Sequence, residues 1–180
     1  MLSLFQKTIS KQTEFKGIGL HSGLESVVKI IPADVNHGII FKRIDLEQNN
    51  IIKANFEKVS SARLCTTIQN SFNISVSTVE HLLAALYITG IDNVLIEINS
   101  SEIPIMDGSS KEFVETFFKT GTKEQSAKRK YLQILKKFEF SENEKLISIE
   151  PNKKSLNVDF QLVYSNNVIG KQRNQINFSD

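Results

Sequence analysis

The sequence predicts an α+β fold: a two-layer domain in which helices cover a sheet, followed by the first strands of a second, similar domain that is cut short. Three observations support this prediction. Strand-like apolar patterns dominate residues 5–76, two helical patterns lie between residues 78 and 119, and only strand patterns occur after residue 130. A length of 180 residues permits one large or two small domains.

The first domain is expected to span residues 1–120 and to consist mostly of strands. Apolar runs bounded by turn residues predict strands at residues 5–16, 24–31, 38–45, 51–57, 65–69, 73–76 and 93–98. Pro32 ends the second of these strands, because its nitrogen cannot donate a hydrogen bond to a neighbouring strand. Asn70-Ser71 separates the two short strands and predicts a hairpin.

The first predicted helix covers residues 78–89. It ends at Gly90, a residue type that favours the left-handed conformation found after many helices. Ser77 and Glu80 match a capping box, in which Ser77 is the N-cap residue and Glu80 reaches back to it from the third helical position.

A second helix is predicted at residues 110–119. Its apolar side contains three phenylalanines: Phe113, Phe117 and Phe118. Asp107 precedes this helix, where it either caps the helix or organises the entry turn. The strands and the two helices together form a unit of about 120 residues, which is large enough to have its own core.

Residues 121–130 are polar, lack periodicity and contain several lysines, so they are expected to form a solvated linker. Beyond it, strands are predicted at residues 131–140, 145–150 and 155–164. One face of the last strand carries Leu156, Val158, Phe160 and Leu162. No helical pattern covers that face, and about 50 residues of bare sheet are marginally stable alone. Residues 131–180 are therefore expected to be the incomplete start of a second domain, in a truncated sequence.

Composition argues against several classes of protein. A formal net charge of +2, with lysines scattered outside the linker, gives no support for nucleic-acid binding. The single cysteine, Cys65, excludes an internal disulfide framework. No apolar run approaches the roughly 20 residues that span a bilayer, and the start of the sequence lacks the apolar region of a signal peptide. A soluble, cytoplasmic protein is expected.

The strongest candidate for chemistry is the adjacent pair Glu80-His81 at the start of the first helix. His81 shares its side of the helix with Ala84, Ala85 and Ile88, and the small neighbours leave room for a ligand to approach. Two structural interpretations compete with this one: Glu80 as no more than the acid of the capping box, and His81 as a hydrogen-bonded core histidine. The segment is not the H-E-x-x-H zinc motif, because no second histidine follows one turn later.

Four motifs strengthen the chemical interpretation. They are Gly-x-Gly-Leu-His-Ser-Gly at residues 17–23, Ser-Thr-Val-Glu-His-Leu at 77–82, Gly-Ile-Asp-Asn at 90–93 and Pro-Ile-Met-Asp-Gly-Ser at 104–109. In order and spacing they resemble the zinc-dependent UDP-3-O-acyl-N-acetylglucosamine deacetylases of lipid A biosynthesis. The resemblance is strong from residue 5 to about residue 118 and looser from there to residue 180.

The resemblance implies that Glu80 is a general base and His81 a Zn²⁺ ligand. It also implies a UDP-linked acylated amino sugar as substrate, a duplicated α+β unit, and a monomer when the protein is complete. The remaining ligands of the family, a histidine and an aspartate, lie in the second domain, as does the histidine that protonates the leaving amine. None has a counterpart here, because no histidine follows His81. The chain is therefore expected to hold half of the active site and to be inactive alone.

The resemblance also draws attention to residues around the pair. His21, in the glycine-rich turn, either lines the substrate cleft or bonds the local backbone, while His37 is expected to be a plain turn residue. Leu64, Cys65 and Thr67 match the family segment that borders the metal and the acyl chain. Cys65 is either a soft ligand near the metal or, as the simpler interpretation, a buried apolar residue.

An alternative from another class is a non-catalytic α+β binding module with an RNA-binding or assembly role. Small α+β units occur in RNA-binding proteins, and the net charge is mildly positive. However, the sequence lacks the interleaved aromatic and basic residues on which single-stranded nucleic acids stack. The zinc hydrolase is therefore the leading hypothesis.

Overall fold

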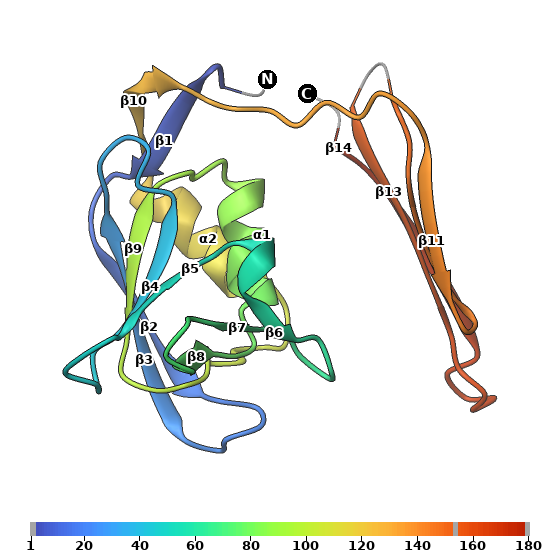
Figure 1. The fold of residues 1–180 in the computed structure, drawn as a ribbon, viewed down its shortest axis with the longest axis horizontal. Helices are drawn as coiled ribbons and strands as arrows, with labels where there is room; N and C mark the ends of the chain where they lie inside the picture. The colour runs from blue at the N-terminus through green and yellow to red at the C-terminus, as the bar shows by residue number, and fades with distance from the viewer. Residues whose placement is uncertain (1–2, 153–154, 179–180) are drawn as a thin grey trace. The chain divides into compact units, whose positions relative to one another are not determined.

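The computed structural model describes residues 3–152 and 155–178 and confirms the α+β fold (Figure 1). The chain divides into two compact units, one from Ser3 to Arg129 and one from Lys130 onward, which are described separately. None of the helices in the described residues combines the length and the apolar character needed to cross a membrane.

A five-stranded sheet forms one layer of the first unit. Its order is β2 (Thr13–Ile18), β3 (Glu25–Pro32), β9 (Val94–Ile98), β4 (Ile39–Arg43) and β5 (Ile51–Lys53). Neighbouring strands are antiparallel, except for β4 and β9, which are parallel. The central position of β9 explains its apolar sequence, since Val94, Ile96 and Ile98 are fully buried. The strands predicted at 24–31, 38–45 and 93–98 are thus confirmed.

A smaller antiparallel sheet contains β6 (Val59–Ser61), β7 (Thr67–Gln69) and β8 (Ser75–Val76). The predicted hairpin between β7 and β8 is confirmed. Oδ1 of Asn70 closes it by accepting hydrogen bonds from the backbone amides of Phe72 at 2.9 Å and Ile74 at 3.1 Å. The strand predicted at 51–57 is shorter than expected, because its last part forms a 3-10 helix, η1 (Phe56–Lys58).

The linker predicted at residues 121–130 is wrong over most of its length. Strand β10 (Thr122–Lys128) occupies this segment and pairs antiparallel with β1 (Phe5–Ile9). Backbone hydrogen bonds hold such a pair, so β10 needs no apolar face. The side chain of Gln125 donates to the backbone carbonyl of Ala33 at 2.8 Å and accepts from the side-chain amide of Asn93 at 2.7 Å. The strand predicted at 5–16 is correspondingly divided into β1 and β2.

Helices α1 (Glu80–Ile88) and α2 (Lys111–Thr120) lie side by side on one face of the five-stranded sheet (Figure 1). The predicted end of α1 is confirmed, since Gly90 follows it with a φ of 69°. The predicted capping box is wrong. Val79 is the N-cap residue, and Ser77 lies outside the helix in a parallel β-bridge with Glu102. The extended pairing of Ser77 removes it from the position that a capping side chain needs.

The start of α2 resolves the role of Asp107. Its Oδ1 accepts hydrogen bonds from the amide of Ser109 at 2.9 Å and from the hydroxyl of Ser109 at 2.8 Å. Asp107 therefore organises the entry turn, while Ser110 is the N-cap residue. Of the three phenylalanines predicted on the apolar side, Phe113 and Phe117 are fully buried, whereas Phe118 is 67% exposed. One helical step of 100° from Phe117 is enough to turn Phe118 toward solvent.

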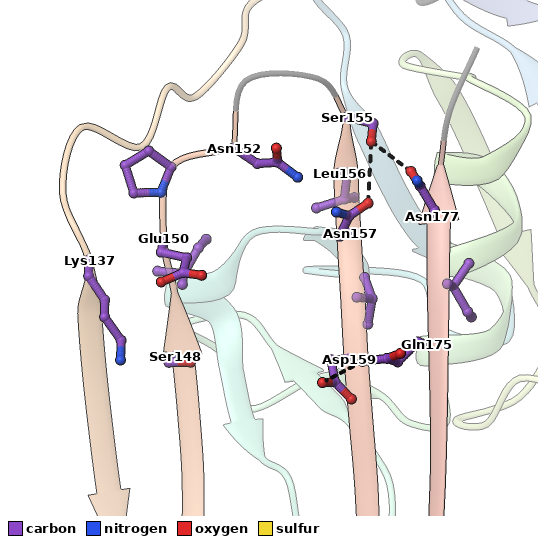
Figure 2. Close-up of a pocket in the computed structure, with 14 residues that line it drawn as sticks. Lys137, Ser148, Glu150, Asn152, Ser155, Leu156, Asn157, Asp159, Gln175 and Asn177 are labelled. Atoms are coloured by element: carbon purple, nitrogen blue, oxygen red, sulfur yellow. Dashed lines mark hydrogen bonds between the residues drawn. The ribbon is translucent and has the colours of Figure 1, made fainter.

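The second unit consists of two antiparallel hairpins. They pair β11 (Phe138–Glu142) with β12 (Lys145–Ile149) and β13 (Leu156–Val163) with β14 (Lys171–Phe178). Its described residues include no helix, and the apolar side chains of β13 are between 37% and 70% exposed. A cleft of about 770 Å³ is lined by both hairpins, and Asp159 and Gln175 bond to each other at its wall (Figure 2).

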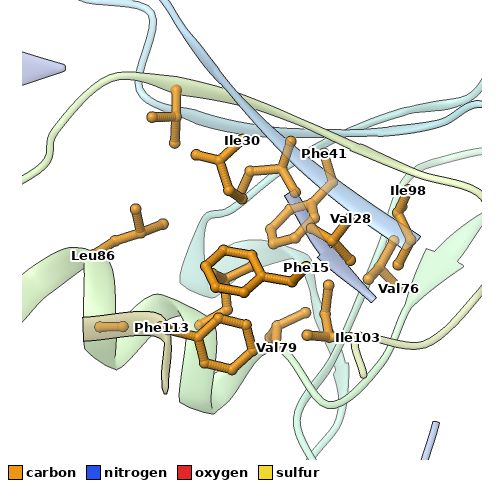
Figure 3. Close-up of a cluster of buried hydrophobic side chains, with 14 of the residues drawn as sticks. Phe15, Val28, Ile30, Phe41, Val76, Val79, Leu86, Ile98, Ile103 and Phe113 are labelled. Carbon is orange, nitrogen blue, oxygen red and sulfur yellow. The ribbon is translucent and has the colours of Figure 1, made fainter. Parts of the chain in front are cut away.

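The core of the first unit joins the sheet to both helices (Figure 3). Buried side chains of β3, β4 and β9 meet those of α1 and α2. The ring of Phe15, on β2, packs edge-on against Phe113 and Phe117, with centroid distances of 4.7 and 5.7 Å. Such aromatic pairs contribute about 0.5–1.5 kcal/mol each beyond the burial of area. They hold α2 against the sheet.

We expect Phe113→Ala to lower the free energy of unfolding by about 3–5 kcal/mol, because it removes a fully buried ring and leaves a cavity. Phe118→Ala, on the same helix, is the matched control and should change stability by less than about 0.5 kcal/mol. Urea unfolding followed by circular dichroism measures both. Equal effects of the two substitutions would contradict the assignment of the buried face.

Candidate active site

Glu80 lies in the first turn of α1 and is held by a neighbouring loop. Its Oε2 accepts a hydrogen bond from the backbone amide of Thr66 at 3.0 Å, and the amide of Val79 donates to the carbonyl of Thr66 at 3.3 Å. The carboxylate therefore does not cap its own helix. Its Oε1 makes no hydrogen bond within the part of the chain that the structure describes. Glu80 is thus oriented through Oε2, while Oε1 has no hydrogen-bond partner among the described residues.

His81 is half-buried beside Glu80, and its Nδ1 atom is buried without a hydrogen-bond partner among the described residues. The interpretation of His81 as a hydrogen-bonded core histidine has no support at this atom, because none of the described residues bonds to it. A buried ring nitrogen without a partner suits a metal ligand, since an imidazole ring can bind metals through either nitrogen. His81 therefore fits the role that a zinc ion would require of it.

One such donor does not make a metal site. Within residues 3–152 and 155–178, no three histidine, cysteine, aspartate or glutamate side chains are grouped so that they could hold a metal ion. Zinc in hydrolytic sites usually has three protein ligands and one open position. The described residues therefore supply a single candidate ligand, His81.

The segment 64–67 borders the start of α1 through Thr66. Leu64 is 86% exposed and has a φ of 67°, which places its side chain at the surface of this loop. Cys65 is partly buried, with its Sγ 3.9 Å from Oγ1 of Thr67. The expectation of a buried cysteine is therefore wrong, because part of the surface of Cys65 stays accessible in this loop. Thr66, which sequence reasoning missed, provides the contact to Glu80.

His21 has an exposed side chain on the loop between β2 and β3. Its backbone amide does not bond the local backbone, as the turn interpretation expected, but donates to the carboxylate of Glu102 at 3.0 and 3.2 Å. His37 is a turn residue as predicted, with Nδ1 3.0 Å from the carbonyl oxygen of Gly38.

Glu102 was not identified from the sequence, although it lies at the junction of these segments. It is 1% exposed and also accepts hydrogen bonds from the amide of Ser22 at 2.7 Å and the hydroxyl of Thr78 at 2.8 Å. Burial raises the pKa of the Glu102 carboxyl, but the donors from His21, Ser22 and Thr78 outweigh it and hold the pKa below its ordinary value. Glu102 is therefore ionised at neutral pH.

The fold and the site define an α+β protein in which an oriented carboxylate and an imidazole with an unpartnered buried nitrogen stand side by side at the start of a helix. The family model of LpxC, described as UDP-3-O-acyl N-acetylglycosamine deacetylase, matches residues 6–180. The chain belongs to this family.

Curated relatives are similar to this chain along nearly all of it. The UDP-3-O-acyl-N-acetylglucosamine deacetylase of Shewanella frigidimarina is 41% identical over 170 residues, which cover 94% of this chain and 55% of the relative. The protein of the same name from Geotalea uraniireducens is 41% identical over 174 residues, covering 97% of this chain and 56% of the relative. The chain thus spans about half the length of the curated relatives that it matches.

Proposed function

We propose that this chain contributes the Glu80–His81 half of the active site of a zinc-dependent hydrolase. The hydrolase would remove the N-acetyl group from UDP-3-O-acyl-N-acetylglucosamine in lipid A biosynthesis. The observation that carries this proposal is the buried, unpartnered Nδ1 of His81 beside the oriented carboxylate of Glu80. Membership of the deacetylase family supports the choice of substrate and reaction.

His81 is proposed as a zinc ligand through its neutral imidazole. A bound zinc ion supplies a Lewis acid for the amide carbonyl and makes its coordinated water more acidic. Glu80 is proposed as the general base that takes a proton from the attacking water. The hydrogen bond from the amide of Thr66 fixes Oε2, so that Oε1 is the oxygen that receives the proton. Acetate and the free amine of the sugar are the products.

The surroundings of the pair are proposed to contact the substrate. The exposed His21 and Leu64, together with Cys65 and Thr67, are assigned to the walls of the substrate cleft. The complete enzyme is proposed to act in the cytoplasm as a monomer on a UDP-linked acylated amino sugar, without nucleic acid.

Reconstitution tests the proposal. Residues 1–180 are fused to, or mixed with, the C-terminal part of the Shewanella frigidimarina relative that this chain does not cover, and the product is called the reconstituted enzyme. With zinc and UDP-3-O-acyl-N-acetylglucosamine, it should release free amine and acetate in equal amounts. A folded reconstituted enzyme that binds zinc but leaves this substrate intact would overturn the proposed function.

We expect His81→Ala to weaken zinc binding by the reconstituted enzyme at least about a hundredfold, since even the loss of residues that support a ligand costs 10–100-fold. His37→Ala is the matched control, because His37 is a turn residue whose ring nitrogen contacts the carbonyl of Gly38. Zinc content after dialysis, measured by atomic absorption, distinguishes the two. Undiminished zinc in the His81 variant would remove His81 from the ligand set.

A further inference from the structure

Glu102 is the only ionisable side chain among the fully buried residues within the described part of the chain. It lies between β9 and α2, and the chemistry proposed above does not use it. Burying a carboxylate is unfavourable unless hydrogen bonds replace the water that it loses. The donors around Glu102 therefore indicate what this residue is for.

The donors come from two segments that are distant in the sequence. On one side, the backbone amides of His21 and Ser22 donate to the carboxylate at distances between 2.7 and 3.2 Å. On the other side, the hydroxyl of Thr78 donates to Oε1 at 2.8 Å. Thr78 is two residues before Glu80. A single buried carboxylate thus joins the loop that carries His21 to the turn that leads into the Glu80–His81 pair.

Both segments have an unusual local geometry where they meet Glu102. Gly19 approaches the carboxylate so closely that a Cβ atom there would lie 2.5 Å from Oε2 of Glu102. Thr78 has a φ of 57°, a conformation that β-branched residues rarely adopt without support from their surroundings. The backbone of Ser77 adds to that support, since it bonds to Ser101 at 2.9 Å and to Ile103 at 3.1 Å.

We propose that Glu102 is a positioning residue, whose buried carboxylate fixes the His21 loop against the turn that presents Glu80 and His81. The geometry of the junction stands by itself, while its relevance to catalysis rests on the proposed function of that pair. Among the described residues, no hydrogen bond joins Glu102 to Glu80 or His81. It acts through Thr78 on one side and through the amides of His21 and Ser22 on the other. Loss of the carboxylate should therefore release both segments together.

Amide hydrogen exchange in residues 1–180, measured for each residue by NMR, tests whether Glu102 couples the His21 loop to the turn before Glu80. The measurement needs no catalytic turnover, so its result does not depend on deacetylase activity. Glu102→Gln keeps the size of the side chain but replaces one carboxylate oxygen by an NH₂ group. That group cannot accept the hydrogen bonds that His21, Ser22 and Thr78 donate. We expect exchange at His21 and Ser22 to become about ten- to hundredfold faster, because a hydrogen bond to a charged group is lost. The backbone and imidazole signals of His81 should shift as well. Exchange in β9 should be unchanged.

A second pair of variants keeps the test valid if Glu102→Gln does not fold. Thr78→Ala removes only the hydroxyl that bonds Glu102, and Thr78→Ser retains it. The alanine variant should shift the His81 signals and accelerate exchange at His21, and the serine variant should restore both. Equal acceleration throughout the first unit would overturn the proposal, because it would show general destabilisation. A loosened His21 loop with unchanged His81 signals, or identical behaviour of the alanine and serine variants, would also overturn it.

Discussion

Replacement of Glu80 by glutamine is expected to lower the kcat of the reconstituted enzyme about 10²- to 10⁴-fold, the usual cost of losing a general base. Glutamine retains a carbonyl oxygen that can accept the hydrogen bond that the Thr66 amide now donates to Glu80 at 3.0 Å. It cannot take a proton from water. The substitution therefore removes the proposed base while it keeps the contact that holds the loop.

The controls for this prediction separate chemistry from structure. Glu97→Gln, on β9, removes a carboxylate that pairs with Lys42 at 3.0 Å on the sheet surface and should leave kcat unchanged. The Glu80 variant should bind zinc and unfold in urea as the unmodified enzyme does. A folded, zinc-loaded Glu80→Gln enzyme with near-normal kcat would mean that Glu80 only anchors the loop at Thr66.

The elements that the sequence predicted well are those with a strong local signal. Gly90 marks the end of α1, Pro32 ends β3, and the apolar run at 93–98 forms the centre of the sheet. The errors have a different origin. The polar segment of β10 was expected to be a linker. Its pairing depends on a distant strand, β1, and no local pattern in the sequence reveals that partner.

The residues of the candidate site likewise divide into those that the sequence identifies and those that it does not. Glu80 and His81 stand together in one motif and could be named from the sequence. The capping box failed because Ser77 pairs with a segment near Glu102, about 25 residues further along the chain. Thr66 contributes through its backbone amide, which is identical in every non-proline residue and so leaves no sequence signal. Glu102 could have been suspected only as an acid that directly precedes the apolar residues 103–106.

The protein consisting of residues 1–180 is expected to release no free amine from UDP-3-O-acyl-N-acetylglucosamine above the uncatalysed background. The reason is the number of ligands. Three protein ligands usually fix a hydrolytic zinc ion, and the described residues group no such set around His81. One imidazole would hold zinc weakly and without fixed geometry, so a water bound there would be neither acidified nor oriented. Glu80 would then have no activated water to deprotonate.

The assay compares three samples at equal zinc concentration: residues 1–180, the C-terminal part of the Shewanella frigidimarina relative, and their mixture. Amine release by the mixture alone would support the proposal that each part supplies some of the ligands. Robust turnover by residues 1–180 alone would contradict the ligand count and require a complete metal site within this chain. Loss of the mixture's activity in His81→Ala would then show that His81 belongs to the same site as the groups supplied by the relative, because a ligand outside that site could be removed without effect.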